Sequence, residues 1–150
     1  MDWKERIKEL ITLSPYVSTK NYLNFGMACE AIGGTVELID DRVRPVMRCV
    51  LHGSKGETFT IDLEDFTRYV YIEMWQEGTP RMYLTANACD IRQEDNRMVL
   101  DCTVVTPKNT PNEFEVRIER TGAGYTVETK YSLEDSSGTD IAFYRDVEEL

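Results

Sequence analysis

After Gly34 the sequence alternates apolar and polar residues with a period of two, and this pattern restricts the fold more than any other feature of the chain. Short clusters rich in Gly, Asp, Asn and Pro interrupt the alternation, as in the Gly-Ser-Lys-Gly segment at 53–56. The pattern predicts eight strands, over residues 36–40, 43–51, 58–63, 69–76, 81–92, 97–105, 114–120 and 125–131. Because no long helical pattern separates these strands, we expect antiparallel hairpins and no parallel βαβ units.

Helical periodicity is confined to the two ends of the chain. Residues 3–11 place Trp, Ile and Leu on one face of a helix, which a Ser-Pro pair ends. A second helix is predicted over residues 20–31, before two consecutive glycines that favour a helix C-terminus. Phe143, Val147 and Leu150 recur at helical spacing, so we also expect a short C-terminal helix.

These elements predict a single α+β domain spanning residues 1–150. One or two N-terminal helices pack on a strongly bent antiparallel meander of about eight strands. A meander of this length either closes into a barrel or stays open with helices on one face, and the pattern leaves both alternatives open. A chain of 150 residues with 41% apolar residues buries a core of this size without needing metals or disulfides.

The four cysteines do not have the spacing of a metal or redox site, because no Cys-x-x-Cys pair occurs. Charged residues interrupt the N-terminal segment, which therefore lacks the apolar run of an export signal, and we expect a cytoplasmic protein. Thiols stay reduced in the cytosol. We therefore expect Cys29, Cys49, Cys89 and Cys102 to be reduced and mostly buried.

A hairpin turn centred on residues 95–96 fixes a register for the two strands beside it. It places Cys89 opposite Cys102, at a distance that allows either a disulfide or the packing of two thiols, and we favour packing. The same register sets Asp90 opposite Asp101, and two like charges in this position destabilise a ladder. The two carboxylates then point into solvent or bind a cation, unless the true register is shifted by one residue.

The chain carries 27 acidic residues against 17 Lys and Arg, a net charge of −10. This excess repels phosphate, so we expect no nucleic-acid partner. No apolar run approaches the roughly 20 residues that cross a bilayer, so we expect no membrane partner. Two windows, 57–77 and 126–150, hold a net charge of −5 each, and the rest of the chain is balanced. If both windows lie on one surface, their potential steers a basic partner toward it.

No motif in the sequence points to catalysis. His52 is the only histidine, it stands at a predicted strand end, and we interpret it as a turn residue. The glycine clusters at 53–56 and 122–124 lack the spacing of phosphate-binding loops, and no serine stands in a Gly-x-Ser-x-Gly elbow. We therefore favour a non-enzymatic protein without a metal or cofactor, and a small enzyme is the weakest alternative.

The hypothesis that fits these features best is a non-enzymatic, acidic, intracellular domain that binds a basic protein. Such a domain would block or escort its partner, as inhibitors, immunity proteins and chaperones do. Its charges would guide the approach, and its aromatic side chains would supply most of the affinity. The expected partner-binding residues are Glu64, Asp65, Tyr71, Glu73, Trp75, Glu77, Asp146, Glu148 and Glu149.

A second hypothesis is a β-barrel that binds a small apolar ligand. Trp75, Met82 and Tyr83 lie on the two strands beside the Glu-Gly turn at 77–78, and aromatic and Met side chains of this kind line ligand cavities. A regular hairpin at this turn would put Trp75 and Met82 on the same face of the sheet. A homo-oligomer is compatible with either hypothesis.

Overall fold

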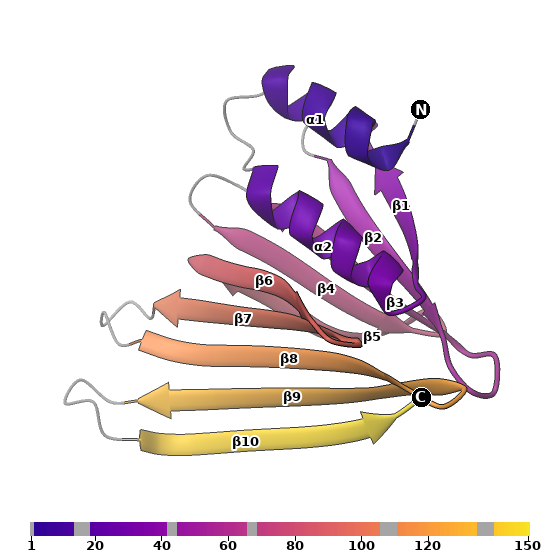
Figure 1. The fold of residues 1–150 in the computed structure, drawn as a ribbon. Helices are drawn as coiled ribbons and strands as arrows, with labels where there is room; N and C mark the ends of the chain where they lie inside the picture. Colours follow the sequence, from indigo (N-terminus) through magenta and orange to yellow (C-terminus); the bar gives the residue numbers. More distant parts are fainter. Residues whose placement is uncertain (1, 14–18, 42–44, 66–68, 106–110, 135–139) are drawn as a thin grey trace.

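The computed structural model describes residues 2–13, 19–41, 45–65, 69–105, 111–134 and 140–150 (Figure 1). In these residues two helices are followed by ten strands. The helices are α1 (Trp3–Leu13) and α2 (Thr19–Ala31). The strands are β1 (Thr35–Ile39), β2 (Val46–His52), β3 (Thr58–Asp65), β4 (Val70–Gln76), β5 (Thr79–Ala86), β6 (Ala88–Glu94), β7 (Arg97–Val105), β8 (Pro111–Thr121), β9 (Gly124–Glu134) and β10 (Asp140–Glu149).

The strands form two five-stranded antiparallel sheets. The first sheet has the order β1-β2-β3-β4-β5, and the second has the order β10-β9-β8-β7-β6. Each sheet keeps two edge strands within the described part of the chain, so the meander does not close into a barrel. The strands of the two sheets run in different directions, and the two helices lie beside the first sheet (Figure 1). The predicted α+β class, with N-terminal helices on antiparallel strands, is confirmed.

One hydrophobic core joins both sheets and α2. Along β3 the side chains of Phe59, Ile61 and Leu63 are buried, and the residues between them are half-buried, as period-two alternation requires. Tyr22 and Phe25 of α2 are fully buried. Because α2 contacts β2 of the first sheet and β6 of the second, it packs against both sheets at once.

Two tyrosines fix the position of α2 through buried hydrogen bonds. The hydroxyl of Tyr22 donates to the carbonyl oxygen of Pro45 at 2.8 Å and accepts from the backbone N–H of Asp65 at 2.8 Å. It thereby joins α2 to the start of β2 and to the end of β3. The hydroxyl of Tyr125 in β9 donates to the carbonyl oxygen of Ile32 at 2.8 Å. This bond satisfies a carbonyl just beyond the end of α2 and ties the helix to the second sheet.

The predicted C-terminal helix is wrong, because this segment forms β10. Its residues pair with β9 in register, with Arg145 opposite Lys130 and Val147 opposite Glu128. The backbones of Leu150 and Tyr125 then exchange hydrogen bonds of 2.7 and 2.9 Å. A helix of about ten residues is marginal on its own, whereas the free edge of β9 offers a complete row of hydrogen-bond partners. The sheet edge therefore determines the structure of this segment.

The chain passes from the first sheet to the second at Asn87. The single strand predicted over residues 81–92 is in fact two strands, β5 and β6, which belong to different sheets. The backbone N–H of Asn87 donates to the carbonyl oxygen of Thr103 at 2.9 Å, which holds this crossing point against β7. Together with β10, this division explains why the described residues form ten strands where the sequence predicted eight.

Two disulfides replace the predicted reduced thiols. Cys29 of α2 bonds to Cys49 of β2, and Cys89 of β6 bonds to Cys102 of β7, with Cα–Cα distances of 5.8 and 4.0 Å. The prediction of four reduced thiols is therefore wrong. Disulfides are rare in the cytosol, so this finding counts against the reasoning behind a cytoplasmic location, which stays a prediction. No helix of the described residues is long and apolar enough to cross a bilayer.

The register predicted from the turn at residues 95–96 is confirmed. Cys89 lies opposite Cys102, and Asp90 lies opposite Asp101. The two aspartates are tolerated because Nη1 of Arg92 lies 3.1 Å from Oδ2 of Asp90 and 3.7 Å from Oδ2 of Asp101. The guanidinium of Arg92, two residues beyond Asp90 on the same strand, thus reduces the repulsion between the two carboxylates.

Candidate functional site

The outer face of the first sheet brings together several of the residues predicted to bind a partner. The register places Asp62 of β3, Glu73 of β4 and Tyr83 of β5 in one row across the sheet. Glu64 lies opposite Tyr71 in the next row. These residues alternate with buried or half-buried ones along their strands, so their side chains share the outer face. We call the group Glu64, Tyr71, Glu73, Trp75 and Tyr83 the aromatic–acidic face.

The carboxylate of Glu73 links its neighbours on this face. One oxygen accepts a hydrogen bond from the Tyr71 hydroxyl at 2.7 Å, and the other accepts from the Trp75 indole N–H at 3.1 Å. All three residues project from the same side of β4, two positions apart. The carboxylate therefore holds both aromatic side chains in fixed orientations before any partner arrives, which lowers the entropy cost of binding.

Trp75 also packs against Tyr83 of the neighbouring strand. Their ring centroids are 6.2 Å apart and their planes are at 84°, an edge-to-face contact. Tyr83 is 53% exposed, which is a large exposure for an aromatic side chain. The pair thus forms an aromatic surface that is ordered and open to solvent. Side chains of this kind are typical anchors in protein–protein interfaces.

The environment of Tyr71 favours the neutral phenol. Partial burial, together with the hydrogen bond to Glu73 and the negative charge of that carboxylate, raises the pKa of Tyr71 to about 12. The Tyr71 hydroxyl therefore remains a hydrogen-bond donor throughout the physiological pH range. Its hydrogen bond holds the Glu73 carboxylate in a fixed orientation on the outer face of the sheet.

The outer positions of β1–β4 carry an excess of negative charge. Arg48 is held by Asp62 through two parallel bonds, Nε to Oδ1 at 2.8 Å and Nη2 to Oδ2 at 2.9 Å. The hydrogen bond to Asp62 is also the main reason that the pKa of Arg48 is raised. Arg48 lies 3.9 Å from Glu37 as well. The outer positions of β1–β4 thus carry one guanidinium, that of Arg48, and four carboxylates. The carboxylates are those of Glu37, Asp62, Glu64 and Glu73.

Two of the predicted binding residues hold the first sheet together instead. Asp65 is 2% exposed, at the buried end of β3 beside the Tyr22 hydroxyl. Glu77 adopts a positive φ of 48° in the turn between β4 and β5. Its carboxylate accepts a hydrogen bond from the backbone N–H of Thr58, and its own N–H donates to the Thr58 carbonyl at 2.9 Å. Glu77 therefore fixes the turn to the start of β3.

A bulge in β5 separates the three residues that were predicted to line a ligand pocket. The pairing changes between Trp75–Pro80 and Met74–Met82, so Arg81 has no opposite residue in the ladder. One inserted residue moves every later side chain to the other face. Tyr83 consequently joins Trp75 on the outer face, and Met82 joins Met74 on the inner face. The predicted pocket of Trp75, Met82 and Tyr83 does not form.

Met82 lines a different cavity, which lies between the two sheets. Its volume is about 360 Å³. The first sheet contributes residues of β3, β4 and β5, and the second contributes residues of β8, β9 and β10. The lining residues are Phe59, Met74, Arg81, Met82, Phe114, Val127, Thr129, Tyr131, Asp146 and Glu148. No sequence pattern predicts this cavity. Its walls come from strands of both sheets, and these strands face each other only because of the way the two sheets pack.

The acidic residues of the C-terminal strand do not join the aromatic–acidic face. Asp146 and Glu148 point into the cavity between the sheets, and Glu148 forms an ion pair with Arg81 of β5. Glu149 is exposed and lies opposite Thr126 on the second sheet. In the part of the chain that the structure describes, the acidic side chains of residues 57–77 and of residues 126–150 therefore lie on different surfaces. The expectation of one shared acidic surface is wrong.

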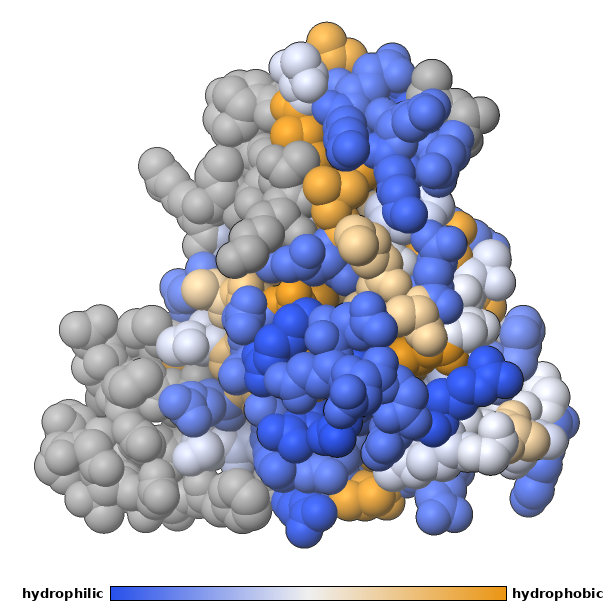
Figure 2. Space-filling model, viewed as in Figure 1, coloured by the Kyte–Doolittle hydropathy of each residue, from blue (hydrophilic) through white to orange (hydrophobic). Residues whose placement is uncertain are grey.

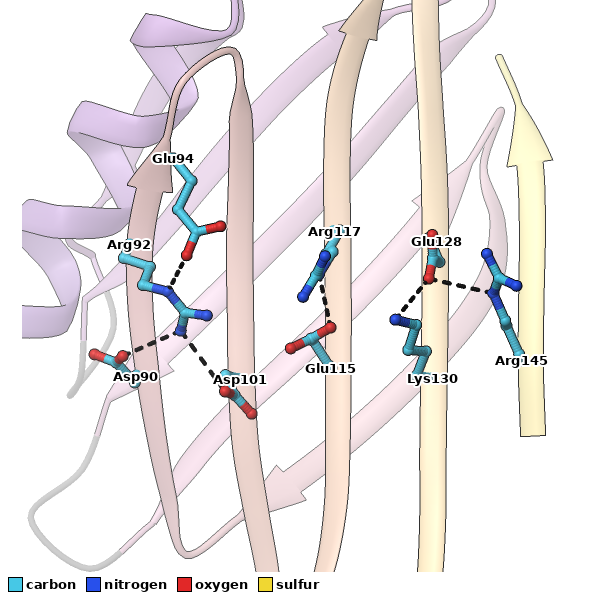
Figure 3. A network of polar contacts seen from close by, with 9 residues as sticks. All are labelled: Asp90, Arg92, Glu94, Asp101, Glu115, Arg117, Glu128, Lys130 and Arg145. Atoms are coloured by element: carbon cyan, nitrogen blue, oxygen red, sulfur yellow. Dashed lines mark hydrogen bonds and ion pairs between the residues drawn. The ribbon is translucent and has the colours of Figure 1, made fainter. Parts of the chain in front are cut away.

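The outer face of the second sheet carries charges that pair with one another (Figure 3). Arg117 Nε lies 2.7 Å from a Glu115 oxygen, and Glu128 lies 3.0 Å from Lys130 and 3.3 Å from Arg145. The hydrogen bond from Lys130 is the main reason that the pKa of Glu128 is lowered. Hydrophilic side chains cover the surface over β6–β9 (Figure 2). Most of the charges on this face are thus paired with one another, and its described side chains include no aromatic pair comparable to Trp75 and Tyr83.

His52 is exposed at the end of β2, and it takes no part in either the aromatic–acidic face or the cavity. Among the residues that the structure describes, no three His, Cys, Asp or Glu side chains gather in a way that could hold a metal ion. Comparisons with protein-family models, with curated proteins and with solved structures found no match. The function is therefore inferred from the geometry of the surfaces themselves.

Proposed function

We propose that this chain is a non-enzymatic binding domain whose aromatic–acidic face engages a basic segment of a partner protein. The observation that carries the proposal is the fixed group of Tyr71, Glu73 and Trp75, extended by the exposed ring of Tyr83. Such binding would either block the activity of the partner protein or escort it as a chaperone does. Both roles require a stable complex and no catalysis.

The aromatic rings supply the contact area in this proposal. Trp and Tyr are enriched among the residues that dominate interface energies, because they bury a large area at a small cost in side-chain entropy. Trp75 and Tyr83 already restrain each other, and Trp75 is also held by Glu73. A partner side chain that covers these rings, such as the planar guanidinium of an arginine, would stack on an ordered surface.

The carboxylates supply selectivity for a basic partner. Glu64 and Glu73 flank the aromatic rings, and Glu37 and Asp62 extend the acidic surface toward β1. The one guanidinium among them, Arg48, is occupied by Asp62. An acidic segment would be repelled by these carboxylates, whereas Lys and Arg side chains would form charge-assisted hydrogen bonds with them.

A fluorescence titration tests the proposal. The chain contains two tryptophans, so in the Trp3→Phe variant Trp75 is the only indole. We expect an arginine-rich peptide to change the Trp75 emission to saturation, with an affinity that falls as ionic strength rises. A peptide of the same length with glutamate in place of arginine should leave the emission unchanged.

A matched pair of variants separates this face from general attraction to an acidic protein. Glu73→Gln removes one negative charge from the aromatic–acidic face, and Glu113→Gln removes one from the outer face of the second sheet. Glu113 is exposed and has no hydrogen bond or ion pair among the described residues. The proposal predicts weaker peptide binding for Glu73→Gln only. Equal losses in both variants would count against it.

A further inference from the structure

We infer that the cavity between the two sheets is a binding site for a small amphipathic cation, a molecule with one amine and an apolar body. The cavity has a volume of about 360 Å³. Ligand pockets in proteins range from about 300 to 1,000 Å³, so this cavity suits a compact ligand. It lies behind β4 and β5, on the side opposite to the aromatic–acidic face, and the inference is independent of the proposed function.

The walls of the cavity select for an apolar body. Phe59 and Met74 from the first sheet face Phe114 and Val127 from the second, and all four are buried. Met82 is half-buried beside them. Aromatic and aliphatic walls gain free energy when they exchange water for an apolar group. The two methionines have flexible side chains that adapt to the shape of a ligand.

The charged residues of the cavity select for an amine. Arg81 and Glu148 form an ion pair that bridges β5 and β10, so their charges cancel. Asp146 has no hydrogen bond or ion pair with any residue that the structure describes. One uncompensated negative charge therefore remains on the lining. A carboxylate next to an apolar wall is stabilised by a cation that also donates hydrogen bonds, which an ammonium group does.

The polar and apolar parts of the cavity have a defined order. The side chains of Arg81 and Glu148 are 35% and 33% exposed, so the charged end faces solvent. The buried Phe and Val residues form the inner end. Thr129 also lines the cavity, opposite Asp146 in the ladder of β9 and β10, and offers a hydroxyl to a bound ligand. A ligand would therefore enter with its apolar body first and leave its amine beside Asp146.

Three matched probes test this inference by calorimetry on the whole protein. They are 3-phenylpropylamine, 3-phenylpropanol and 3-phenylpropionate, which share one body and differ in charge. We expect the amine to bind tightest, the alcohol more weakly, and the carboxylate not at all. Equal binding of amine and carboxylate, or no binding of any probe, would overturn the inference.

Two variants locate the site. Asp146→Asn should weaken amine binding by about tenfold and leave alcohol binding unchanged, because a single charge-assisted hydrogen bond accounts for a loss of that size. Met82→Trp fills the cavity and should abolish binding of both probes. Glu149→Gln is the control, since it removes an exposed charge of the same strand on the other face. If Asp146→Asn and Glu149→Gln behave alike, the amine does not bind beside Asp146.

Discussion

The indole of Trp75 and the phenol ring of Tyr83 meet edge to face on the outside of the first sheet, with centroids 6.2 Å apart. The contact exists because the bulge at Arg81 turns Tyr83 toward the side on which Trp75 lies. Glu73 holds the indole from the other direction. The fold thus presents two ordered aromatic rings beside carboxylates, and this arrangement is the basis of the proposed binding function.

Removing the indole should weaken the binding of a basic partner. We expect Trp75→Ala to raise the Kd for an arginine-rich peptide by roughly 30-fold, equivalent to about 2 kcal/mol, which is typical of a central aromatic anchor. Fluorescence anisotropy of a labelled peptide measures this change. Val147→Ala, which removes an exposed apolar side chain from the second sheet, is the control and should bind normally. Equal Kd values for the two variants would contradict the prediction.

Tyr71 should make the first sheet sensitive to alkaline pH. Its pKa is raised from 10.0 to about 12 in the folded protein, so folding favours the neutral phenol. The corresponding stability is fully present below pH 10.0 and is lost as the pH rises toward 12. The difference between the phenolate absorbance titrations of the native protein and of Tyr71→Phe should show a step near pH 12.

The Glu73→Gln variant tests the part of this pKa shift that Glu73 adds to the effect of burial. Glutamine carries no charge, so the Tyr71 step should move toward lower pH in this variant. If the step stays in place, the carboxylate does not interact with the phenol as the 2.7 Å distance indicates.

Tyr22 should be among the residues that stabilise the fold most. Tyr22→Phe keeps the buried ring but removes the hydroxyl that joins Pro45 and Asp65. It leaves a buried carbonyl and a buried N–H with one partner fewer, so we expect a loss of about 2 kcal/mol in the free energy of unfolding. Urea denaturation measures this loss. Tyr83→Phe removes an exposed hydroxyl and should have no measurable effect, and similar values for both variants would argue against the buried bridge.

The disulfides predict a specific thiol count. Protein that is unfolded in denaturant without a reductant should show no reactive thiol, and reduction should release four. The Cys29→Ser/Cys49→Ser double variant opens a link across 20 residues and should lose about 3 kcal/mol of stability, on the chain-entropy model. Four reactive thiols before reduction would instead support the reduced, cytosolic state that the sequence alone suggested.

The strands and their local registers could be predicted from the sequence because they depend on neighbouring residues. Period-two burial along β3 and the pairing of Cys89 with Cys102 both follow from alternation and a short turn. The position of Glu73 on the same face as Tyr71 and Trp75 follows for the same reason. Each of these features depends only on one strand or one hairpin.

The features that the sequence did not predict depend on contacts between distant segments. The bulge at Arg81 reverses the faces of Met82 and Tyr83, and Pro80 is the one local sign of it. The helical spacing of Phe143 and Val147 was outweighed by the free edge of β9. The two acidic windows belong to different sheets, and no local pattern shows which way the sheets face.

Chemical-shift mapping by NMR tests the central claim most directly. The labelled protein is titrated with an arginine-rich peptide at low ionic strength, and the backbone amide shifts are followed residue by residue. The account predicts that the largest shifts lie on β3, β4 and β5 around Tyr71, Glu73 and Trp75, together with the indole N–H of Trp75. Shifts that concentrate on the outer face of the second sheet, around Glu113 and Glu115, would contradict it.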